Sequence, residues 1–477
     1  MADNQETLHV HFMGIMGSGC ASIAKLALEQ GYRVSGCDTS LNSYYADDLK
    51  AHGVKIEEGH DVSHLTDDVD IVAVSPAIFD MNPDNPELKE ADKRGILMTW
   101  QEFMGKYLQA GKRVVAVSGT HGKTTTTFLT AEILVDAGLD PTVEGGSVYK
   151  KWGSGGRAGS SDLFLCEADE FNRNFFHYRP ETAVVLSVEM DHPECFRDEE
   201  EVLNAFVHFL SKGTKLKNIV LNGDDPGAVE VLKRSLSDPE AAEAETYLFF
   251  RDDEKPLPFS VKHYHPAVYS IRSRKKEGTA FTLSLDGREE TFTIRIPGDY
   301  NVMNAAAAVL TAKILGVSSE TIRGSLLSFS GAGRRFDLVG TFRSVPVYDD
   351  YAHHPTEIRS VLSMTKTYFP GEKVLAVFEP HQISRLTMMF DGYVGSLTIA
   401  EHVIITKTHI GREILKGVVP IAPEVWENAS DRIIYEEDPV RIREIASELI
   451  EKEECTLIVV IGAANSYKLS RFLVSEA

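Results

Sequence analysis

Apolar runs and helical stretches alternate along the first part of the chain. Residues 8–13 form an apolar run, and a glycine-rich turn separates it from a helical pattern over residues 20–30. A second apolar run at residues 33–37 ends at Asp38, and a third covers residues 71–74. Buried runs that alternate with helices predict a parallel sheet with right-handed crossovers.

The rest of the chain divides into two further segments. A new apolar run begins at residues 112–117, and residues 277–296, with an Asp-Gly pair near their centre, have the pattern of a β-hairpin. From residue 331 onward, short apolar runs again alternate with helical stretches. The sequence therefore predicts an α/β protein of three domains, over residues 1–111, 112–330 and 331–477. Further buried strands are expected at residues 163–166, 182–188, 218–221, 374–378, 402–406 and 457–461.

The charge of the chain excludes some classes of partner. The 477 residues carry a formal net charge of −22. A field of that sign repels phosphate, which argues against nucleic acid or an anionic membrane as a partner. The chain has no uncharged apolar run of about 18–20 residues, and residues 1–8 lack a signal-peptide pattern. We therefore expect a cytoplasmic protein that acts on small molecules.

The cysteine pattern predicts neither disulfides nor a metal site. None of the five cysteines (Cys20, Cys37, Cys166, Cys195 and Cys455) stands in a CxxC pair. Scattered thiols of this kind are typical of buried small residues in a reducing compartment. We therefore expect no zinc site.

The most specific motif is a phosphate-binding loop at residues 118–125. An apolar run leads into this glycine turn, and a helical pattern follows it. Amides at a helix N-terminus attract anions, and glycines let the backbone approach phosphate oxygens. Lys123 is then placed to neutralise the β and γ oxygens, and the Thr124 hydroxyl to ligate Mg²⁺. Val117 stands where the strict motif has glycine, so spacing alone leaves an unrelated glycine turn as the alternative.

Acidic residues and a histidine follow two of the predicted strands. Glu167, Asp169 and Glu170 come after one strand, and carboxylate oxygens suit a hard divalent cation. His192 follows the next strand along the chain. Taken alone, the carboxylates are also consistent with a solvated surface and the histidine with a structural role. The nearby phosphate loop is what favours a magnesium site.

These motifs together resemble those of the Mur ligases, which link amino acids to UDP-muramyl precursors of peptidoglycan. The phosphate loop resembles the ATP loop of that family, and further motifs follow in the expected order over nearly the whole chain. Residues 348–357 are nearly identical to the family form, with Ala352 in place of glycine. Residues 378–385 resemble the alanine-adding members, although Gln382 replaces an arginine and Glu379 a glutamine. Ser187 stands where the family usually has asparagine.

The resemblance implies an ATP-dependent ligase of three domains. A Rossmann-like domain would bind UDP-N-acetylmuramate, a central P-loop domain with a mixed sheet would bind ATP and Mg²⁺, and a second Rossmann-like domain would bind L-alanine. An amide bond would form through an acyl phosphate on the lactyl carboxylate, in peptidoglycan precursor synthesis. No nucleic-acid or membrane partner is implied, and the chain is expected to be a monomer or homodimer.

The resemblance also assigns residues to roles. The catalytic residues would be Lys123, Glu167, His192 and His353, and the Mg²⁺ ligands Thr124, Glu167 and His192. ATP would contact Gly119, Thr120, His121, Gly122, Lys123, Thr124, Thr125, Asn301, Asn304, Arg335 and Asp350. The UDP-sugar would contact Gly14, Gly17, Ser18, Gly19, Asp38 and Ser75, and the amino acid Tyr351, His353, His381 and Arg385. A capping role for Asn301 at the start of its helix is a compatible alternative.

Four other functions remain open at this point. Within the family, residues 175–180 and 378–380 favour an enzyme that reattaches a recycled tripeptide to UDP-N-acetylmuramate, whereas His381 and Arg385 favour alanine. The loss of the arginine at Gln382 adds to that question, and Lys407 or Arg412 is a candidate to compensate for it. Folylpolyglutamate synthetases share the ATP loop but lack the first domain. A nicotinamide oxidoreductase would leave the phosphate loop unexplained, and the last alternative is an ATP-binding switch without catalysis.

Overall fold

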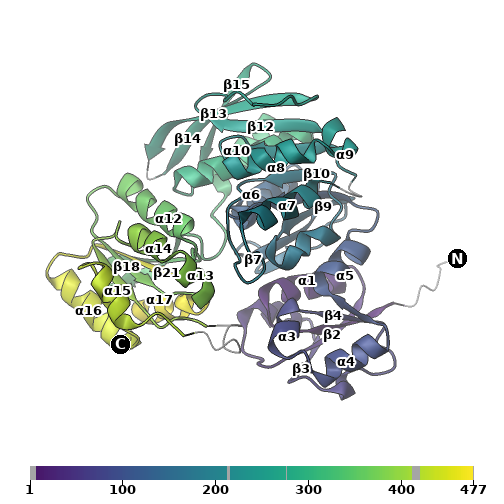
Figure 1. Cartoon of the computed structure of the whole chain (residues 1–477), viewed down its shortest axis with the longest axis horizontal. Helices are drawn as coiled ribbons and strands as arrows, with labels where there is room; N and C mark the ends of the chain where they lie inside the picture. Colours follow the sequence, from purple (N-terminus) through teal and green to yellow (C-terminus); the bar gives the residue numbers. More distant parts are fainter. Residues whose placement is uncertain (1–6, 212–214, 276, 411–418, 476–477) are drawn as a thin grey trace.

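Three sheets, each with its own helices, divide the protein into three α/β domains (Figure 1). The computed structural model describes residues 7–211, 215–275, 277–410 and 419–475. The predicted three-domain α/β fold is thereby confirmed. The exact domain boundaries stay predictions.

The first domain contains a five-stranded parallel sheet in the order β3-β2-β1-β4-β5. The central strand β1 is buried along its whole length, as its apolar pattern predicts. Its strands are β1 (His9–Met13), β2 (Arg33–Asp38), β3 (Lys55–Glu58), β4 (Ile71–Val74) and β5 (Leu97–Thr99). Its helices are α1 (Ser18–Glu29), α2 (Asp47–Ala51), α3 (Pro76–Met81), α4 (Pro86–Lys93) and α5 (Trp100–Phe103), with short turns η1 (Tyr44–Ala46), η2 (Val62–His64) and η3 (Met104–Leu108).

The central domain contains a mixed ten-stranded sheet in the order β15-β14-β13-β12-β11-β10-β6-β9-β7-β8. The strands around β6 are parallel, and the predicted hairpin is the antiparallel pair β14–β15. Its strands are β6 (Arg113–Ser118), β7 (Thr142–Tyr149), β8 (Ser154–Arg157), β9 (Leu163–Ala168), β10 (Thr182–Val185), β11 (Asn218–Asn222), β12 (Glu245–Arg251), β13 (Tyr264–Lys275), β14 (Gly278–Leu285) and β15 (Arg288–Ile294). Its helices are α6 (Lys123–Asp136), η4 (Phe171–His177), α7 (Glu199–Leu210), α8 (Pro226–Ser235), α9 (Pro239–Glu243), α10 (Asp299–Ile314) and α11 (Ser319–Ser328).

The third domain contains a six-stranded sheet in the order β16-β17-β21-β18-β19-β20, antiparallel only between β16 and β17. Its strands are β16 (Asp337–Phe342), β17 (Val345–Asp350), β18 (Val374–Phe378), β19 (His402–Ile405), β20 (Ile433–Tyr435) and β21 (Leu457–Ile461). Its helices are α12 (Pro355–Tyr368), α13 (Ile383–Met388), α14 (Phe390–Leu397), α15 (Pro423–Ala429), α16 (Pro439–Glu451) and α17 (Ser466–Val474).

Two local expectations were wrong. The strand predicted at residues 182–188 ends at Val185, because the chain then leaves the sheet and the Val188 amide donates to Asp225 Oδ1 at 3.0 Å. Asn301 does not cap its helix. Helix α10 already begins at Asp299, with Gly298 as its N-cap, and the Asn301 side chain donates to the Pro297 carbonyl at 2.6 Å.

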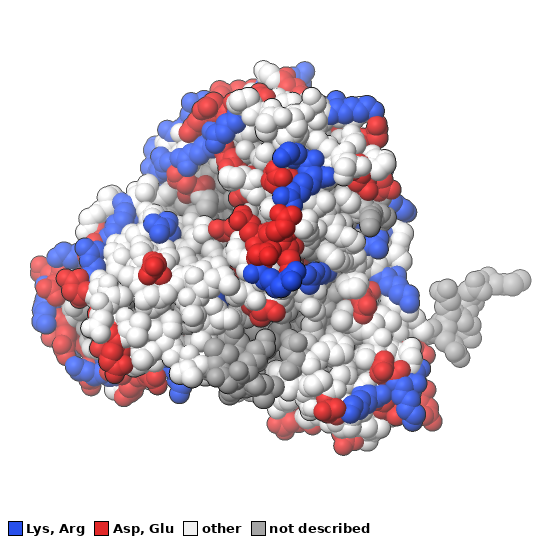
Figure 2. Space-filling model, in the orientation of Figure 1, with Lys and Arg blue, Asp and Glu red and all other residues white. Residues whose placement is uncertain are grey.

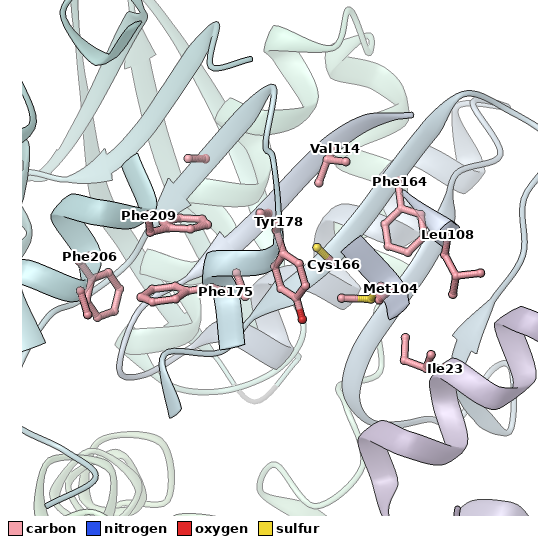
Figure 3. Packing of buried hydrophobic residues seen from close by; sticks show 14 of the residues in the cluster. Ile23, Met104, Leu108, Val114, Phe164, Cys166, Phe175, Tyr178, Phe206 and Phe209 are labelled. Carbon is pink, nitrogen blue, oxygen red and sulfur yellow. The ribbon is translucent and has the colours of Figure 1, made fainter. Parts of the chain in front are cut away.

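The first two domains share one hydrophobic core (Figure 3). Ile23 of α1 lies beside Met104 and Leu108 of η3, and these side chains continue the packing to Phe164 of β9. The third domain has separate clusters on the two faces of its own sheet. The phosphate loop and the first glycine turn are therefore carried by parts of the molecule that pack together, whereas the third domain has a core of its own.

The net negative charge is spread over a mixed surface. Figure 2 shows acidic and basic side chains interspersed on the face in view, with an acidic group near its middle. Among the helices of the described residues, none has the length and apolar character needed to cross a membrane.

Candidate functional site

The phosphate loop connects β6 to α6 in the way the sequence predicts. Gly122 has a φ of 86°, and a side chain there would approach Asn304 Oδ1 to 2.4 Å, so only glycine fits. Ser187 supports the loop, since its carbonyl accepts from the Thr120 amide at 2.8 Å and its Oγ from the His121 amide at 3.0 Å. The Ser187 hydroxyl thus accepts a hydrogen bond from the loop at the position where the family usually has asparagine. Helix α6 then begins at Lys123 and directs its N-terminus at the loop.

Lys123 lies against the acidic residues that follow β9. Its Nζ donates to Glu170 Oε2 and to the Gly119 carbonyl, each at 2.7 Å, and lies 3.9 Å from Asp169 Oδ1. Burial opposes the charge on Lys123, but Glu170, Asp169 and Glu167 outweigh it and raise the pKa above its ordinary value. The lysine is therefore held as a cation at the point where the loop would receive phosphate oxygens.

The predicted magnesium ligands fall into two adjoining groups. Thr124 Oγ1 donates to Glu167 Oε2 at 2.9 Å, so these two predicted ligands lie together. His192 does not lie with that pair; it groups with Asp169 and Glu170, whose ligand atoms are within 4.8 Å of its own. Because Glu170 also binds Lys123, the second group adjoins the phosphate loop. The sequence grouped Glu170 with the candidate metal-binding carboxylates, but the family resemblance did not make it a ligand.

His121 of the loop connects the central and third domains. Its Nδ1 lies 3.2 Å from Glu357 Oε1 at the start of α12, and its Nε2 contacts Glu189 of the loop after β10. Burial opposes the charge on His121, but the two carboxylates outweigh it and raise its pKa to about 10. Arg335 approaches the same Glu357 at 3.8 Å and lies over the ring of Tyr351. An ionic cluster thus joins the phosphate loop to the third domain. Glu357 belongs to the motif at residues 348–357, but the sequence assigned it no role.

A buried arginine lies on the other side of His192. Arg385 is 1% exposed, and its Nη2 pairs with Asp191 Oδ1 at 2.7 Å and lies 3.5 Å from His192 Nδ1. Its Nε and Nη1 have no hydrogen-bond partner within the described chain. Burial opposes ionisation of Asp191, but His192 and Arg385 outweigh it and hold its pKa below the ordinary value. The guanidinium is therefore held through Nη2, and its Nε and Nη1 groups can donate to a bound anion.

The other residues predicted around the amino acid gather near Arg385. The His353 ring lies 5.6 Å from the Tyr351 ring and 6.2 Å from the His381 ring, centroid to centroid. Burial and the nearby Arg385 lower the pKa of His353 to about 4, and burial lowers that of His381 as well. Both histidines are therefore neutral at pH 7.

The departures from the alanine-adding pattern have a local explanation. Gln382 donates from Nε2 to Glu194 Oε1 at 3.0 Å, and the same carboxylate oxygen lies 3.1 Å from His192 Nδ1. Lys407 does not replace the missing arginine, because its side chain is 75% exposed and its nearest acidic partner is Glu437, at 4.0 Å. The second candidate, Arg412, lies outside the described residues.

The residues predicted to contact the adenine end of ATP make hydrogen bonds with other groups of the protein. Asn304 Nδ2 approaches Asn301 Oδ1 at 3.5 Å, so the two amides share a helix face as their spacing predicts. Both oxygens of Asp350 accept backbone amides, from Phe336 at 2.7 Å and Ala352 at 2.8 Å. Burial raises the pKa of Asp350 to about 6. Asp350 thus holds the backbone at Phe336 and Ala352 in place, near the start of the third domain.

The first glycine turn lies at the carboxyl ends of β1, β2 and β4. Gly14 has a φ of 81°, and a side chain there would approach the Ser75 Cβ to 2.8 Å. Asp38 Oδ2 accepts from the Met16 amide at 3.0 Å, and α1 begins at Ser18. The predicted UDP-sugar residues of three strands therefore meet at one edge of the sheet, as the rule for parallel α/β sheets requires.

Three protein families match consecutive parts of the chain. These are "Mur ligase family, catalytic domain" over residues 9–112, "Mur ligase middle domain" over residues 117–312, and "Mur ligase, glutamate ligase domain" over residues 334–464. The chain is 35% identical over 469 residues to the UDP-N-acetylmuramate–L-alanine ligase of Aquifex aeolicus, which covers 98% of this chain and 97% of the relative. It is 33% identical over 413 residues to that of Lachnospira eligens, covering 86% of each.

Two solved structures have the same three-domain fold. The UDP-N-acetylmuramate–alanine ligase of Thermotoga maritima matches with a TM-score of 0.76 at 22% identity, over 98% of both chains. A murein peptide ligase from Psychrobacter arcticus matches with a TM-score of 0.69 at 24% identity, over 98% of this chain and 100% of the other. At these identities the two structures support the fold alone.

Proposed function

Because the chain belongs to the Mur ligase family, we propose that it joins L-alanine to the lactyl carboxylate of UDP-N-acetylmuramate at the expense of ATP. The observation that carries this proposal is one line of contacts, from Lys123 through Glu170 to His192, and from there to Asp191 and Arg385. Lys123, our proposed phosphate-binding cation, and the Arg385 guanidinium, which has two N–H groups without partners in the described chain, lie on either side of His192. A carboxylate activated by phosphorylation at one end would meet an amino acid held at the other.

The donor groups near the loop fit magnesium. Thr124 and Glu167 offer two oxygens 2.9 Å apart, and Asp169, Glu170 and His192 offer two carboxylates and an imidazole. Such oxygen-rich sets hold Mg²⁺ together with phosphate and water. When bound there, Mg²⁺ supplies positive charge that offsets the repulsion between a carboxylate and the ATP phosphates. These residues are our proposed ligands.

The protein's own residues mainly bind and orient the reactants. Lys123 is a cation and would hold oxygens of the transferred phosphoryl group, as would the amides at the start of α6. His353 is neutral, so it does not repel the incoming ammonium group and can accept a hydrogen bond from it. The third domain covers the loop through His121 and Glu357, which would keep water from the acyl phosphate.

Arg385 favours alanine over a recycled tripeptide. A free amino acid presents its α-carboxylate beside the attacking amine, and the Nε and Nη1 groups of Arg385 are donors for such an anion. In the tripeptide, the alanyl carboxyl group is part of a peptide bond and carries no charge. A buried guanidinium would then keep unsatisfied donors, which costs free energy. The tripeptide stays the alternative that the test below must exclude.

We assign the UDP-sugar to residues 1–111, ATP to residues 112–330 and the amino acid to residues 331–477. The reaction would supply peptidoglycan precursors in the cytoplasm, where both nucleotides are available, and would serve cell-wall synthesis, cell shape and cell division. We expect the protein to be a monomer or homodimer.

Phosphate release tests the proposal directly. Purified protein with ATP, Mg²⁺ and UDP-N-acetylmuramate is offered L-alanine, glycine, L-serine or L-alanyl-γ-D-glutamyl-diamino-acid tripeptide, and the UDP product is identified by mass. We expect release only with the UDP-sugar present and a clear preference for L-alanine. A preference for the tripeptide would replace alanine as the acceptor, and release without UDP-N-acetylmuramate would exclude the ligase.

A further inference from the structure

A further group of side chains that can bind a metal lies inside the first domain, apart from the two groups beside the phosphate loop. It consists of His11 in the middle of β1, Cys37 near the end of β2, His64 at the end of η2 and Glu87 in the first turn of α4. One ligand atom from each lies within 4.8 Å of all the others, and His11, Cys37 and Glu87 are completely buried. We propose that these four residues bind a zinc ion, a site separate from the magnesium ligands of the central domain.

Four of the six separations between the ligand atoms are close to those of a tetrahedral zinc site. His11 Nε2 lies 3.4 Å from Cys37 Sγ and 3.0 Å from Glu87 Oε1. Glu87 Oε1 lies 3.5 Å from Cys37 Sγ and 3.4 Å from His64 Nδ1. With Zn–N near 2.0–2.1 Å and Zn–S near 2.3 Å, neighbouring ligands of a tetrahedron are roughly 3.3–3.6 Å apart. Three of these four separations lie in that interval, and the one between His11 and Glu87 needs to lengthen by only a few tenths of an ångström. The two remaining separations, from His64 to His11 and to Cys37, are within 4.8 Å.

The residues around this group orient the ligands. His11 Nδ1 lies 2.9 Å from Ser35 Oγ. With the proton on Nδ1, the ring donates to that hydroxyl and presents a lone pair on Nε2 to the metal, the usual arrangement around ligating histidines. His60 Nδ1 lies 3.1 Å from Cys37 Sγ and 3.6 Å from Glu87 Oε2. It is therefore placed to donate a hydrogen bond to the thiolate from outside the ligand set.

Charge balance favours an ion in this place. Zn²⁺ bound to one thiolate, one carboxylate and two neutral imidazoles has no net charge, which is the state that a buried site favours. Thiolate and imidazole ligands also select zinc over magnesium or calcium.

The site would fix the glycine turn of the first domain. The Cys37 carbonyl accepts from the amides of Gly14 at 2.8 Å and Ile15 at 3.3 Å, and the next residue, Asp38, accepts from the Met16 amide. A metal bound to Cys37 therefore holds the end of β2 against β1, η2 and α4 and stabilises the turn that β2 supports. All four ligands come from the protein, which is typical of structural zinc.

Cysteine spacing could not have found this site. The ligands are separated by at least 23 residues along the chain, and His11 lies in an apolar strand where a histidine would ordinarily be structural. Only the parallel register of β1 and β2, which pairs Met13 with Cys37, brings the first two ligands together. The expectation of no zinc site rested on the absence of a CxxC pair and is replaced by this proposal.

The first test measures metal in the wild-type protein. Protein purified under reducing conditions from zinc-supplemented culture is dialysed and its metal content determined; we expect about one zinc per chain. Exchange with Co²⁺ should produce a thiolate-to-cobalt charge-transfer band, which reports a cysteine ligand and not the magnesium site. No retained zinc, together with no such band after Co²⁺ addition, would overturn the proposal, and this arm needs no variant to fold.

The second test uses matched variants. Cys37→Ser and His64→Gln should lose the bound zinc and the cobalt band. Cys455→Ser should keep both, because Cys455 is an equally buried thiol that stands in no metal-ligand group of the described residues. Metal loading should also raise the Tm and slow amide hydrogen exchange in peptides covering residues 14–20. A cobalt band that persists in Cys37→Ser would contradict the site as described. So would amide hydrogen exchange in residues 14–20 that is equally fast with and without zinc.

Discussion

Replacing Arg385 by lysine isolates the role of its unpaired donors. The guanidinium is 1% exposed, pairs with Asp191 through Nη2 and leaves Nε and Nη1 without partners in the described chain. A lysine keeps the positive charge beside Asp191 but cannot present a planar pair of N–H groups to a carboxylate. Arg385→Ala would be a poorer test, because an unpaired buried carboxylate costs about 3–5 kcal/mol and would perturb folding.

The expected effect is confined to the amino acid. A hydrogen bond to a charged group contributes about 1.5–3 kcal/mol. At about 1.4 kcal/mol per tenfold change, this predicts a loss of about 10- to 140-fold in kcat/KM for L-alanine. Arg385 is far in sequence from the glycine turn of the first domain, and the contacts described for it are to Asp191 and His192. The KM for UDP-N-acetylmuramate should therefore change little.

Steady-state phosphate release with each substrate varied in turn measures both effects. Lys407→Ala is the control, since this lysine of the same domain is 75% exposed and has only a long contact to Glu437. A lysine variant that keeps the wild-type Tm and the wild-type kcat/KM for L-alanine would refute the assignment. An equal loss for both substrates would show that Arg385 positions the third domain instead.

Three further predictions concern the phosphate loop and its neighbours. Lys123→Ala should lower kcat about 100-fold or more and leave UDP-N-acetylmuramate binding intact by calorimetry; lost UDP-sugar binding would contradict this. Glu167→Gln and His192→Ala should both raise the Mg²⁺ concentration needed for half-maximal rate, and an unchanged Mg²⁺ dependence would remove them as ligands. The pKa of His121 is raised from 6.5 to about 10, so its ionic contribution to stability is complete below pH 6.5 and is lost as the pH rises through 10. The Tm should therefore fall across that window, and a His121→Gln variant with the same pH profile would argue against the cluster.

The sequence predicted the parts of the site that single segments build. The strand–turn–helix of residues 113–136 follows from an apolar run, glycines and a helical pattern, all of which are local. The pairing of Thr124 with Glu167 also follows, because β6 and β9 are parallel neighbours. Glu167 lies near the carboxyl end of β9, and Thr124 lies in the first turn of α6, which follows the loop at the carboxyl end of β6. Motif position was sufficient there, since the sheet fixes the geometry.

The contacts between domains could not be predicted in the same way. Arg385 and Asp191 are 194 residues apart, and His121 and Glu357 are 236 apart, so no periodicity relates them. The Arg334-Arg335 pair shows the same limit. Arg334 pairs with Asp349 at 3.0 Å and is buried, whereas Arg335 lies 3.8 Å from Glu357, the residue of the same domain that also contacts His121. Identical neighbouring side chains thus differ in role only because the chain turns between them.

The distribution of unsatisfied polar atoms supports the position of the site independently of any motif. Folded proteins rarely leave buried donors or acceptors without partners, since each costs about 1–3 kcal/mol. In the part of the chain that the structure describes, such atoms include Arg385 Nε and Nη1, His381 Nδ1, Glu194 Oε2 and Glu170 Oε1. Arg385, Glu194 and Glu170 all have His192 as a neighbour, and the His381 ring lies 6.2 Å from that of His353. Such atoms also occur elsewhere, for example at Gln101, Gln109 and Trp426, so a single one does not identify a site. Their concentration between the phosphate loop and α13 is consistent with polar ligands that bind there.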